Sequence, residues 1–159
     1  MKEEFPQLEQ REYQKQFLDD WFSRNKLFRG GRQSGKTTMM LCEAKRFDDA
    51  GFDILFLSDS VQMSQYVKQM FKQLFDTSHE INFGNYKALD KGNFMGYNYN
   101  VVILDEFQNI TLEQYNRFIA PMQLKFMRAS ACMSSMNNHW LIDAGCSTDA
   151  ALFDSIYER

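Results

Sequence analysis

The spacing of apolar residues along the chain predicts strands and helices in regular alternation. Short, mostly apolar runs are typical of strands buried in a parallel sheet, and they occur at residues 53–58 and 101–104. A further short strand is expected at residues 26–29, directly before a pair of glycines. Apolar residues at helical spacing predict amphipathic helices, at residues 11–23, 37–49 and 63–74. This alternation predicts a mainly parallel β-sheet with helices on both of its faces, an α/β fold.

The other segments are less regular. Residues 76–100 interleave glycines with aromatic residues, so we expect an irregular region that contains at most short strands. Thr111 to Gln114 has the form of a capping box, which predicts the start of a helix. The remaining pattern predicts a strand at 126–134, a second at 140–142 and a terminal helix at 149–157.

Length and composition narrow the class of protein. The 159 residues fit one domain, 1–159. No run of eighteen apolar residues is present, so no membrane span is expected and the protein should be soluble. The net charge of −3 argues against a whole surface devoted to nucleic acid. The three cysteines show no CxxC pairing, which indicates reduced thiols in a cytosolic setting: Cys42, Cys132 and Cys146.

The strongest chemical signal is a phosphate-binding loop. Residues 30–37 read Gly-Gly-Arg-Gln-Ser-Gly-Lys-Thr and match the pattern G-x-x-x-x-G-K-[ST] between a predicted strand and a predicted helix. Glycines let backbone N–H groups surround phosphates at the positive end of the helix dipole. We expect Lys36 to reach the β- and γ-phosphates of ATP and Thr37 to ligate Mg²⁺. The predicted nucleotide-binding residues are Gly30, Gly31, Gln33, Ser34, Gly35, Lys36, Thr37 and Thr38.

A second signal is the acidic pair that follows the strand at 101–104. Ligands of open α/β sheets bind at the carboxyl ends of the strands, and Asp105 and Glu106 lie at such an end. We expect Asp105 to hold Mg²⁺ and Glu106 to act as general base toward the attacking water. Adjacent carboxylates favour hydrolysis over phosphoryl transfer to a small substrate. The sequence therefore predicts a P-loop NTPase of the RecA-like, additional-strand type that hydrolyses ATP.

Three weaker signals leave alternatives open. Arg32 either offsets charge near the γ-phosphate, as an arginine finger does, or points to solvent from its loop. Gln14 carries an amide that can pair with adenine, although spacing alone supports this role weakly. Small polar residues lie at the end of the strand at 126–134 and directly after it: Ser134, Ser135 and Asn137. They either sense the γ-phosphate, and so couple hydrolysis to movement, or form an ordinary turn.

These segments together resemble the ATPase domain of large terminases, the DNA-packaging motors of tailed bacteriophages and related viruses. The resemblance rests on residues 11–18, 31–38 and 101–106, and more loosely on 134–138, where Met136 replaces an expected proline. It implies that Gln14 reads adenine, that Arg32 is catalytic, and that residues 134–138 are the coupling motif, through Ser134, Ser135 and Asn137.

The same resemblance implies partners and a location. The expected partners are double-stranded DNA, a portal protein, a separate nuclease or small terminase subunit, and further copies of the chain in a ring. The expected location is the cytoplasm of an infected host cell. The chain departs from typical large terminases in its shorter ATPase domain and in having no acidic cluster of a nuclease domain after Ile142. Either it is a minimal or divergent relative that acts with a separate nuclease, or it is a piece of a longer protein.

Other readings of the sequence remain open. The residues Asp105-Glu106-Phe107-Gln108 also resemble motif II of UvrD-type helicases, in which Gln14 would equally read the base. This reading gives a helicase-like, superfamily 1 or 2 ATPase fragment, because the ATP site of such enzymes needs a second motor domain. A regulatory module that binds ATP without hydrolysing it is a third possibility, and a nucleotide kinase, disfavoured by the acidic pair, is a fourth.

Overall fold

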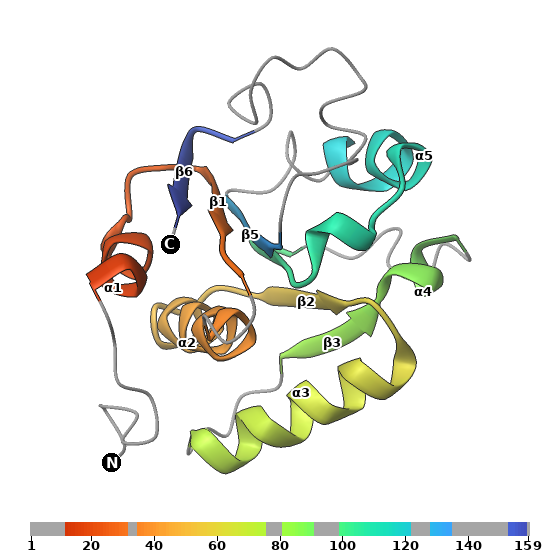
Figure 1. The fold of residues 1–159 in the computed structure, drawn as a ribbon. Helices are drawn as coiled ribbons and strands as arrows, with labels where there is room; N and C mark the ends of the chain where they lie inside the picture. The colour runs from red at the N-terminus through yellow and green to blue at the C-terminus, as the bar shows by residue number, and fades with distance from the viewer. Residues whose placement is uncertain are drawn as a thin grey trace.

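A six-stranded, all-parallel β-sheet forms the centre of the protein in the computed structural model of this chain (Figure 1). The residues that the structure describes are 12–31, 35–75, 81–90, 99–121, 128–134 and 153–158. In chain order the strands are β1 (Asn25–Arg29), β2 (Ile54–Ser58), β3 (Asn82–Asn85), β4 (Val101–Leu104), β5 (Arg128–Met133) and β6 (Ser155–Glu158). Their order across the sheet is β3-β2-β4-β5-β1-β6, so β5 lies between β1 and β4.

Helices cover both faces of this sheet, as the sequence predicted (Figure 1). One face carries α1 (Glu12–Asp19), α2 (Lys36–Asp49) and α3 (Val61–Leu74). The other carries α4 (Tyr86–Asp90), the short turn η1 (Phe107–Asn109), α5 (Leu112–Gln114) and the π-helical turn η2 (Tyr115–Ile119) that continues α5. Within the described ranges, no helix combines the length and the apolar character needed to cross a membrane.

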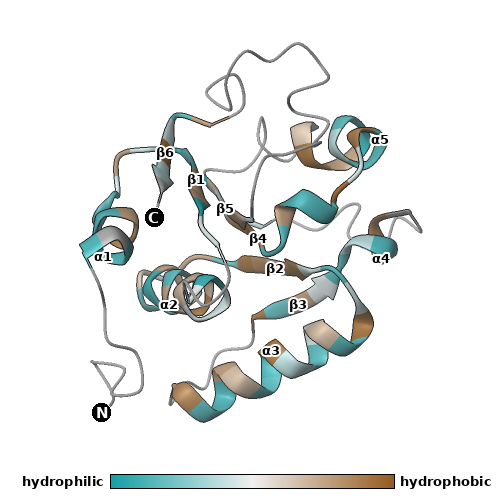
Figure 2. Cartoon of the chain, viewed as in Figure 1, coloured by the Kyte–Doolittle hydropathy of each residue, from teal (hydrophilic) through white to brown (hydrophobic). Residues whose placement is uncertain are grey.

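Two hydrophobic clusters, one on each face, hold the layers together. Side chains alternate along a strand, so Ile54 and Phe56 of β2 join the cluster under α2 and α3, whereas Leu55 and Leu57 join the opposite one. All residues of β2 are buried, and Figure 2 shows this strand as a brown, hydrophobic band inside the fold. Burial on both faces explains why β2 reads as a continuous apolar run rather than an alternating one.

Side-chain caps set two of the helix starts. Ser60 precedes α3, and its hydroxyl accepts a hydrogen bond from the backbone N–H of Met63 at 3.1 Å. Thr111 and Gln114 form the predicted capping box, because each side chain accepts from the other residue's backbone N–H at 3.1 Å. These contacts satisfy N–H groups that have no partner within the first helical turn.

The C-terminal segment differs from the prediction. Residues 155–158 are not the end of a helix but strand β6, which pairs in parallel with β1. The backbone N–H of Asp154 donates to the carbonyl of Asn25 at 2.7 Å, and the Asp154 carboxylate accepts from the N–H of Asn25 at 3.0 Å. Pairing with the open edge of β1 thus outweighed the local sequence pattern that predicted a helix. Tertiary pairing of this kind is hard to recognise in the sequence of a short segment.

Two other segments also differ from the prediction. Helix α1 ends at Asp19 rather than near residue 23, because the Asp20 carboxylate accepts from the N–H groups of Phe22 and Ser23 and turns the chain. The region expected to be irregular contains β3 and α4. The strand predicted at 140–142 lies outside the described residues.

Candidate nucleotide site

The loop between β1 and α2 places Gly35 in a conformation that suits glycine. Gly35 precedes the first residue of α2 and has φ 71° and ψ 28°, in the left-handed region that side-chain-bearing residues seldom adopt. A β-carbon placed there would lie 2.7 Å from Nε2 of Gln14, which is closer than non-bonded atoms approach. The backbone conformation therefore favours glycine at this position, whereas the Gln14 amide is the end of a flexible side chain and would only have to shift to admit a β-carbon.

Lys36 and Thr37 are the first two residues of α2, and their side chains contact two different parts of the site. The Lys36 ammonium donates to the carbonyl oxygens of Gly30 at 3.0 Å and Gly31 at 2.8 Å, so it lies over the start of the loop. The Thr37 hydroxyl donates to Oδ2 of Asp105 at 3.1 Å, across 68 positions of sequence. The loop and the acidic pair, predicted separately, thus meet at one place.

Asp105 is fully buried directly after β4. Its Oδ1 accepts from the thiol of Cys132 at 2.9 Å and from the N–H of Glu106 at 3.1 Å. Burial raises the pKa of Asp105 and the charge of Glu106 adds to this, while the hydrogen bonds from Cys132 and Thr37 oppose it. A buried carboxylate with this environment is stabilised in its charged form when a cation lies beside it.

Glu106 stands on a constrained backbone. Its φ of 54° and ψ of 49° make it the one non-glycine residue with positive φ in the described part of the chain. This conformation costs about 1–2 kcal/mol for a residue that carries a β-carbon, and such strain concentrates at functional sites. The Glu106 carboxylate accepts a hydrogen bond from Nε2 of Gln108, two residues farther on.

Gln108 joins the ends of two neighbouring strands. While its Nε2 holds Glu106 after β4, its Oε1 accepts from the N–H of Ser134, directly after β5, at 3.2 Å. Strands β4 and β5 are adjacent and parallel, so the expectation that residue 134 lies near the acidic pair is confirmed. The amide of Gln108 is a direct connection between the predicted base and the first residue of the predicted coupling motif.

Three side chains at the site carried no role in the sequence prediction. Gln108 contacts Glu106, Cys132 contacts Asp105, and the hydroxyl of Tyr86 donates to the backbone carbonyl of Asp105. Gln108 has a sequence signal, since it follows the acidic pair by two positions. Cys132 and Tyr86 have none, because their proximity to Asp105 depends on the order of β4 and β5 and on the position of α4.

The structure places some of the predicted residues and leaves others undescribed. Gln14 is buried in α1 with its amide against Gly35, and Thr38 lies half-buried in the first turn of α2. Among the described residues, no cluster of three or more His, Cys, Asp or Glu side chains is placed to hold a metal ion. Five predicted site residues lie outside the described ranges: Arg32, Gln33, Ser34, Ser135 and Asn137.

Comparison with solved structures identifies the fold. The chain is similar to the UvsW helicase of bacteriophage T4, with a TM-score of 0.74 and 13% identity over 96% of this chain and 61% of that one. It is also similar to the large terminase ATPase domain of a Thermus phage, with a TM-score of 0.70 and 13% identity over 96% of this chain and 82% of that domain. A third similar structure is the N-terminal domain of the bacteriophage phi29 DNA packaging ATPase, with a TM-score of 0.61 and 14% identity over 91% of this chain and 93% of that domain.

These likenesses establish a RecA-like P-loop NTPase fold. The chain spans less than two thirds of the length of the helicases it resembles, 61% for UvsW and 38% for the Hef helicase domain of Pyrococcus furiosus. No protein-family model and no curated protein sequence matches it.

Proposed function

We propose that this chain is an ATP-hydrolysing motor domain, similar to the terminase large subunit, that couples ATP hydrolysis to translocation of double-stranded DNA into a viral capsid. The observation that carries the proposal is the 3.1 Å hydrogen bond from Thr37 to Asp105. It joins the first turn of the helix after the glycine loop to the carboxyl end of β4. A triphosphate on the loop would therefore lie beside the acidic pair.

The donor atoms present suit Mg²⁺ and a triphosphate. Mg²⁺ prefers oxygen ligands and is bound by one or two protein oxygens together with phosphates and water, rather than by a cage of side chains. The Thr37 hydroxyl and the Asp105 carboxylate supply such oxygens. When bound, Mg²⁺ would offset negative charge on the β- and γ-phosphates.

The chain's own residues then divide the chemistry of hydrolysis. Lys36 would exchange the carbonyls of Gly30 and Gly31 for phosphate oxygens, which accept hydrogen bonds from an ammonium more strongly. Glu106 would take a proton from the attacking water. Gln108 holds the Glu106 carboxylate and contacts Ser134, so a shift of the base during hydrolysis would be felt at the end of β5.

The similar structures support a DNA motor of one of two kinds, a packaging ATPase or a helicase-like ATPase. Two of them are a large terminase ATPase domain and a DNA packaging ATPase, and the chain spans 82% and 93% of these domains. These two likenesses support the packaging function. The second candidate is a helicase-like, DNA-dependent ATPase fragment, favoured by the TM-score of 0.74 to the UvsW helicase and by Gln108 after the acidic pair.

The packaging function implies an assembly. Double-stranded DNA would be the polymer substrate. A portal protein and a separate nuclease or small terminase subunit would be partners in the cytoplasm of the infected host cell. We also propose that several copies form a homo-oligomeric ring, as the resemblance to terminases implies.

The form of DNA that stimulates phosphate release separates these functions. Purified chain would be assayed with Mg²⁺ and ATP, alone and with blunt double-stranded or single-stranded DNA, at increasing protein concentration. A packaging motor is expected to release little phosphate when dilute and to respond to double-stranded DNA as its concentration rises. The Lys36→Ala variant controls for contaminating ATPases.

Two results would overturn the packaging proposal. Stimulation by single strands, with unwinding of a tailed duplex, would assign the chain to the helicase-like class. ATP binding without phosphate release, at high protein concentration and with either DNA, would leave a passive nucleotide-binding module.

A further inference from the structure

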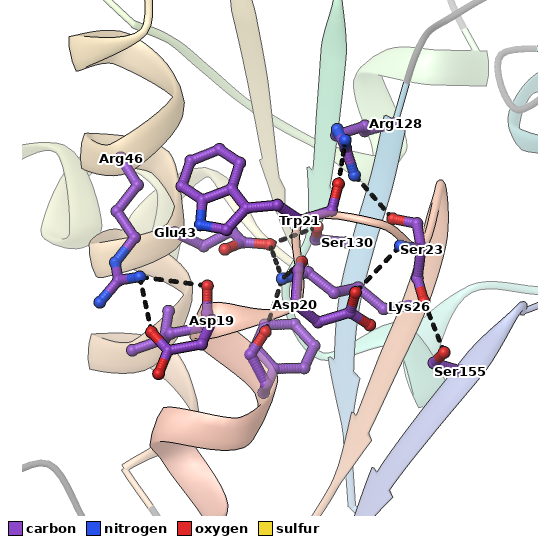
Figure 3. A network of polar contacts seen from close by, with 12 residues as sticks. Asp19, Asp20, Trp21, Ser23, Lys26, Glu43, Arg46, Arg128, Ser130 and Ser155 are labelled. Carbon is purple, nitrogen blue, oxygen red and sulfur yellow. Dashed lines mark hydrogen bonds and ion pairs between the residues drawn. The ribbon is translucent and has the colours of Figure 1, made fainter.

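Helix α1 is held at its C-terminal end by cations from the two elements that flank the glycine loop (Figure 3). The Lys26 ammonium, on β1, donates to the backbone carbonyls of Phe17 at 2.6 Å and Asp20 at 3.0 Å. The Arg46 guanidinium, on α2, donates to the carbonyl of Leu18 at 3.2 Å and forms an ion pair with Asp19 at 3.1 Å. Carbonyls in the last turn of a helix lack intrahelical partners and carry its negative dipole end, so cations stabilise them.

Lys26 is itself fixed by a buried carboxylate. Its ammonium lies 2.8 Å from Oε2 of Glu43 on α2, and the Ser130 hydroxyl of β5 donates to the same oxygen at 2.7 Å. Lys26 and Glu43 are each only 1% exposed. Burial raises the pKa of Glu43 and lowers that of Lys26, while each charge opposes the shift of the other. We call Lys26, Glu43 and Arg46 together the α1 anchor.

A buried ion pair is a poor means of stabilising a fold, which suggests another reason for this one. Replacing such a pair with apolar residues of similar volume is often neutral or stabilising, because both ions lose their hydration. Helix α1 has only eight residues, and helices this short are not stable without tertiary contacts. Its position is therefore set by tertiary contacts, which are the anchor at its C-terminal end and the burial of Phe17 and Leu18 in the core shared with α2.

That position decides where Gln14 lies. Gln14 precedes Phe17 and Leu18 by three and four residues, so it shares their face of the helix. Its buried amide lies against Gly35, the last residue of the loop before α2. The anchor binds the carbonyls of Phe17 and Leu18 from β1 and α2, and the loop connects these same two elements. The position of Gln14 relative to the loop is thus fixed.

We propose that the α1 anchor is a specificity-determining positioning device, which holds Gln14 where its amide discriminates adenine from a triphosphate that carries no base. The inference rests on the proposed function, since it takes ATP as the ligand of the loop. The described hydrogen bonds and ion pairs of the anchor reach α1, Asp20 and Ser130 rather than the loop. Loss of the anchor is therefore expected to weaken recognition of the base and to leave recognition of the phosphates intact.

The test compares binding of Mg²⁺-ATP with binding of Mg²⁺-tripolyphosphate by the full chain. The variants are Arg46→Met and the double variant Lys26→Met/Glu43→Met, with Gln14→Ala as reference. Lys45→Met is the matched control, because Lys45 neighbours Arg46 on α2 but its ammonium pairs with Asp49 at 2.8 Å. Amide hydrogen exchange of α1, measured on the same samples, reports whether the helix has loosened.

Both anchor variants and Gln14→Ala are expected to lose about threefold or more in the ratio of ATP affinity to tripolyphosphate affinity, the effect of one or two hydrogen bonds. In the anchor variants α1 should exchange faster, and Lys45→Met should match wild type in both measurements. Arg46→Lys, which keeps a cation, is expected to recover part of the ratio.

Three outcomes would overturn the inference. If both affinities fall together, the anchor only supports the fold of the loop. If α1 exchanges faster while the ratio stays constant, the position of the helix does not set specificity. If Gln14→Ala leaves the ratio unchanged, base recognition does not use this residue. Hydrolysis of ATP by wild-type protein would still stand in each case, so failure of the inference is separable from failure of the proposed function.

Discussion

At the scale of single residues, the site is defined by a few polar contacts between segments distant in sequence. Thr37 reaches Asp105, and Gln108 joins Glu106 to the backbone of Ser134. Motif spacing predicted the first pair, because both motifs were recognisable and both follow strands whose carboxyl ends share an edge. The role of Gln108 was not predictable in the same way, since Ser134 is 26 positions away and meets it only through the pairing of β4 with β5.

The bridging role of Gln108 leads to a prediction about turnover. Gln108→Ala removes the donor that orients Glu106 and the acceptor that meets Ser134, but it touches neither the loop nor Thr37. We expect kcat for ATP hydrolysis to fall roughly three- to tenfold, the effect of losing an orienting hydrogen bond, with KM unchanged. Steady-state phosphate release at several ATP concentrations separates the two constants.

A neighbouring residue supplies the control for this prediction. Asn109 lies in the same turn, and its side-chain amide donates to Asp59 at 3.1 Å while its contact with Glu106 is made by the backbone N–H. Asn109→Ala should therefore retain wild-type kcat. Equal losses in both variants would mean that the turn, and not the Gln108 amide, matters.

At the scale of elements, the sequence predicted those whose pattern is local. The buried runs of β2 and β4 and the apolar faces of α2 and α3 appear close to their expected positions. Strand β3 falls in the region where short strands at most were expected, and β6 was mistaken for a helix, because both mix polar with apolar residues and exist through pairing with β2 and β1. Strand β4 is equally short, but its four residues are all apolar and buried, which is the pattern of a central strand.

The turn after α1 offers a pH test of how β6 is held. Asp20 accepts hydrogen bonds from Phe22, Ser23 and the hydroxyl of Tyr157 on β6. Partial burial raises the pKa of Asp20, but these hydrogen bonds outweigh it and lower the pKa from 3.8 to about 2. A carboxylate with a depressed folded-state pKa contributes stability above its unfolded pKa, and loses it as the pH falls toward the folded value.

Wild-type protein should therefore be more stable than Asp20→Asn by a constant margin above about pH 5, and the margin should shrink between about pH 4 and pH 2. Urea unfolding of both proteins across this range measures the difference in unfolding free energy. A margin that stays constant down to pH 2 would show that the carboxylate is not held by these contacts.

At the scale of the whole molecule, the strand order gives the site its shape. Placing β5 between β1 and β4 separates the loop from the acidic pair by one strand, whose end carries Ser134. Helix α2 crosses this gap, so Thr37 meets Asp105 while Lys36 remains over the loop. The loop, the acidic pair and the end of β5, which the proposed reaction needs, therefore meet at the carboxyl edge of the sheet.

The central claim is that Lys36 and Glu106 act on one triphosphate, the first by binding it and the second by activating water. Its most direct test is ATP affinity together with single-turnover phosphate release for Glu106→Gln and Lys36→Ala. Glu106→Gln should bind ATP within about twofold of wild type and release phosphate at least about a hundredfold more slowly, as expected for loss of a general base. Lys36→Ala should lose both binding and release. Phosphate release by Glu106→Gln at the wild-type rate would contradict the account.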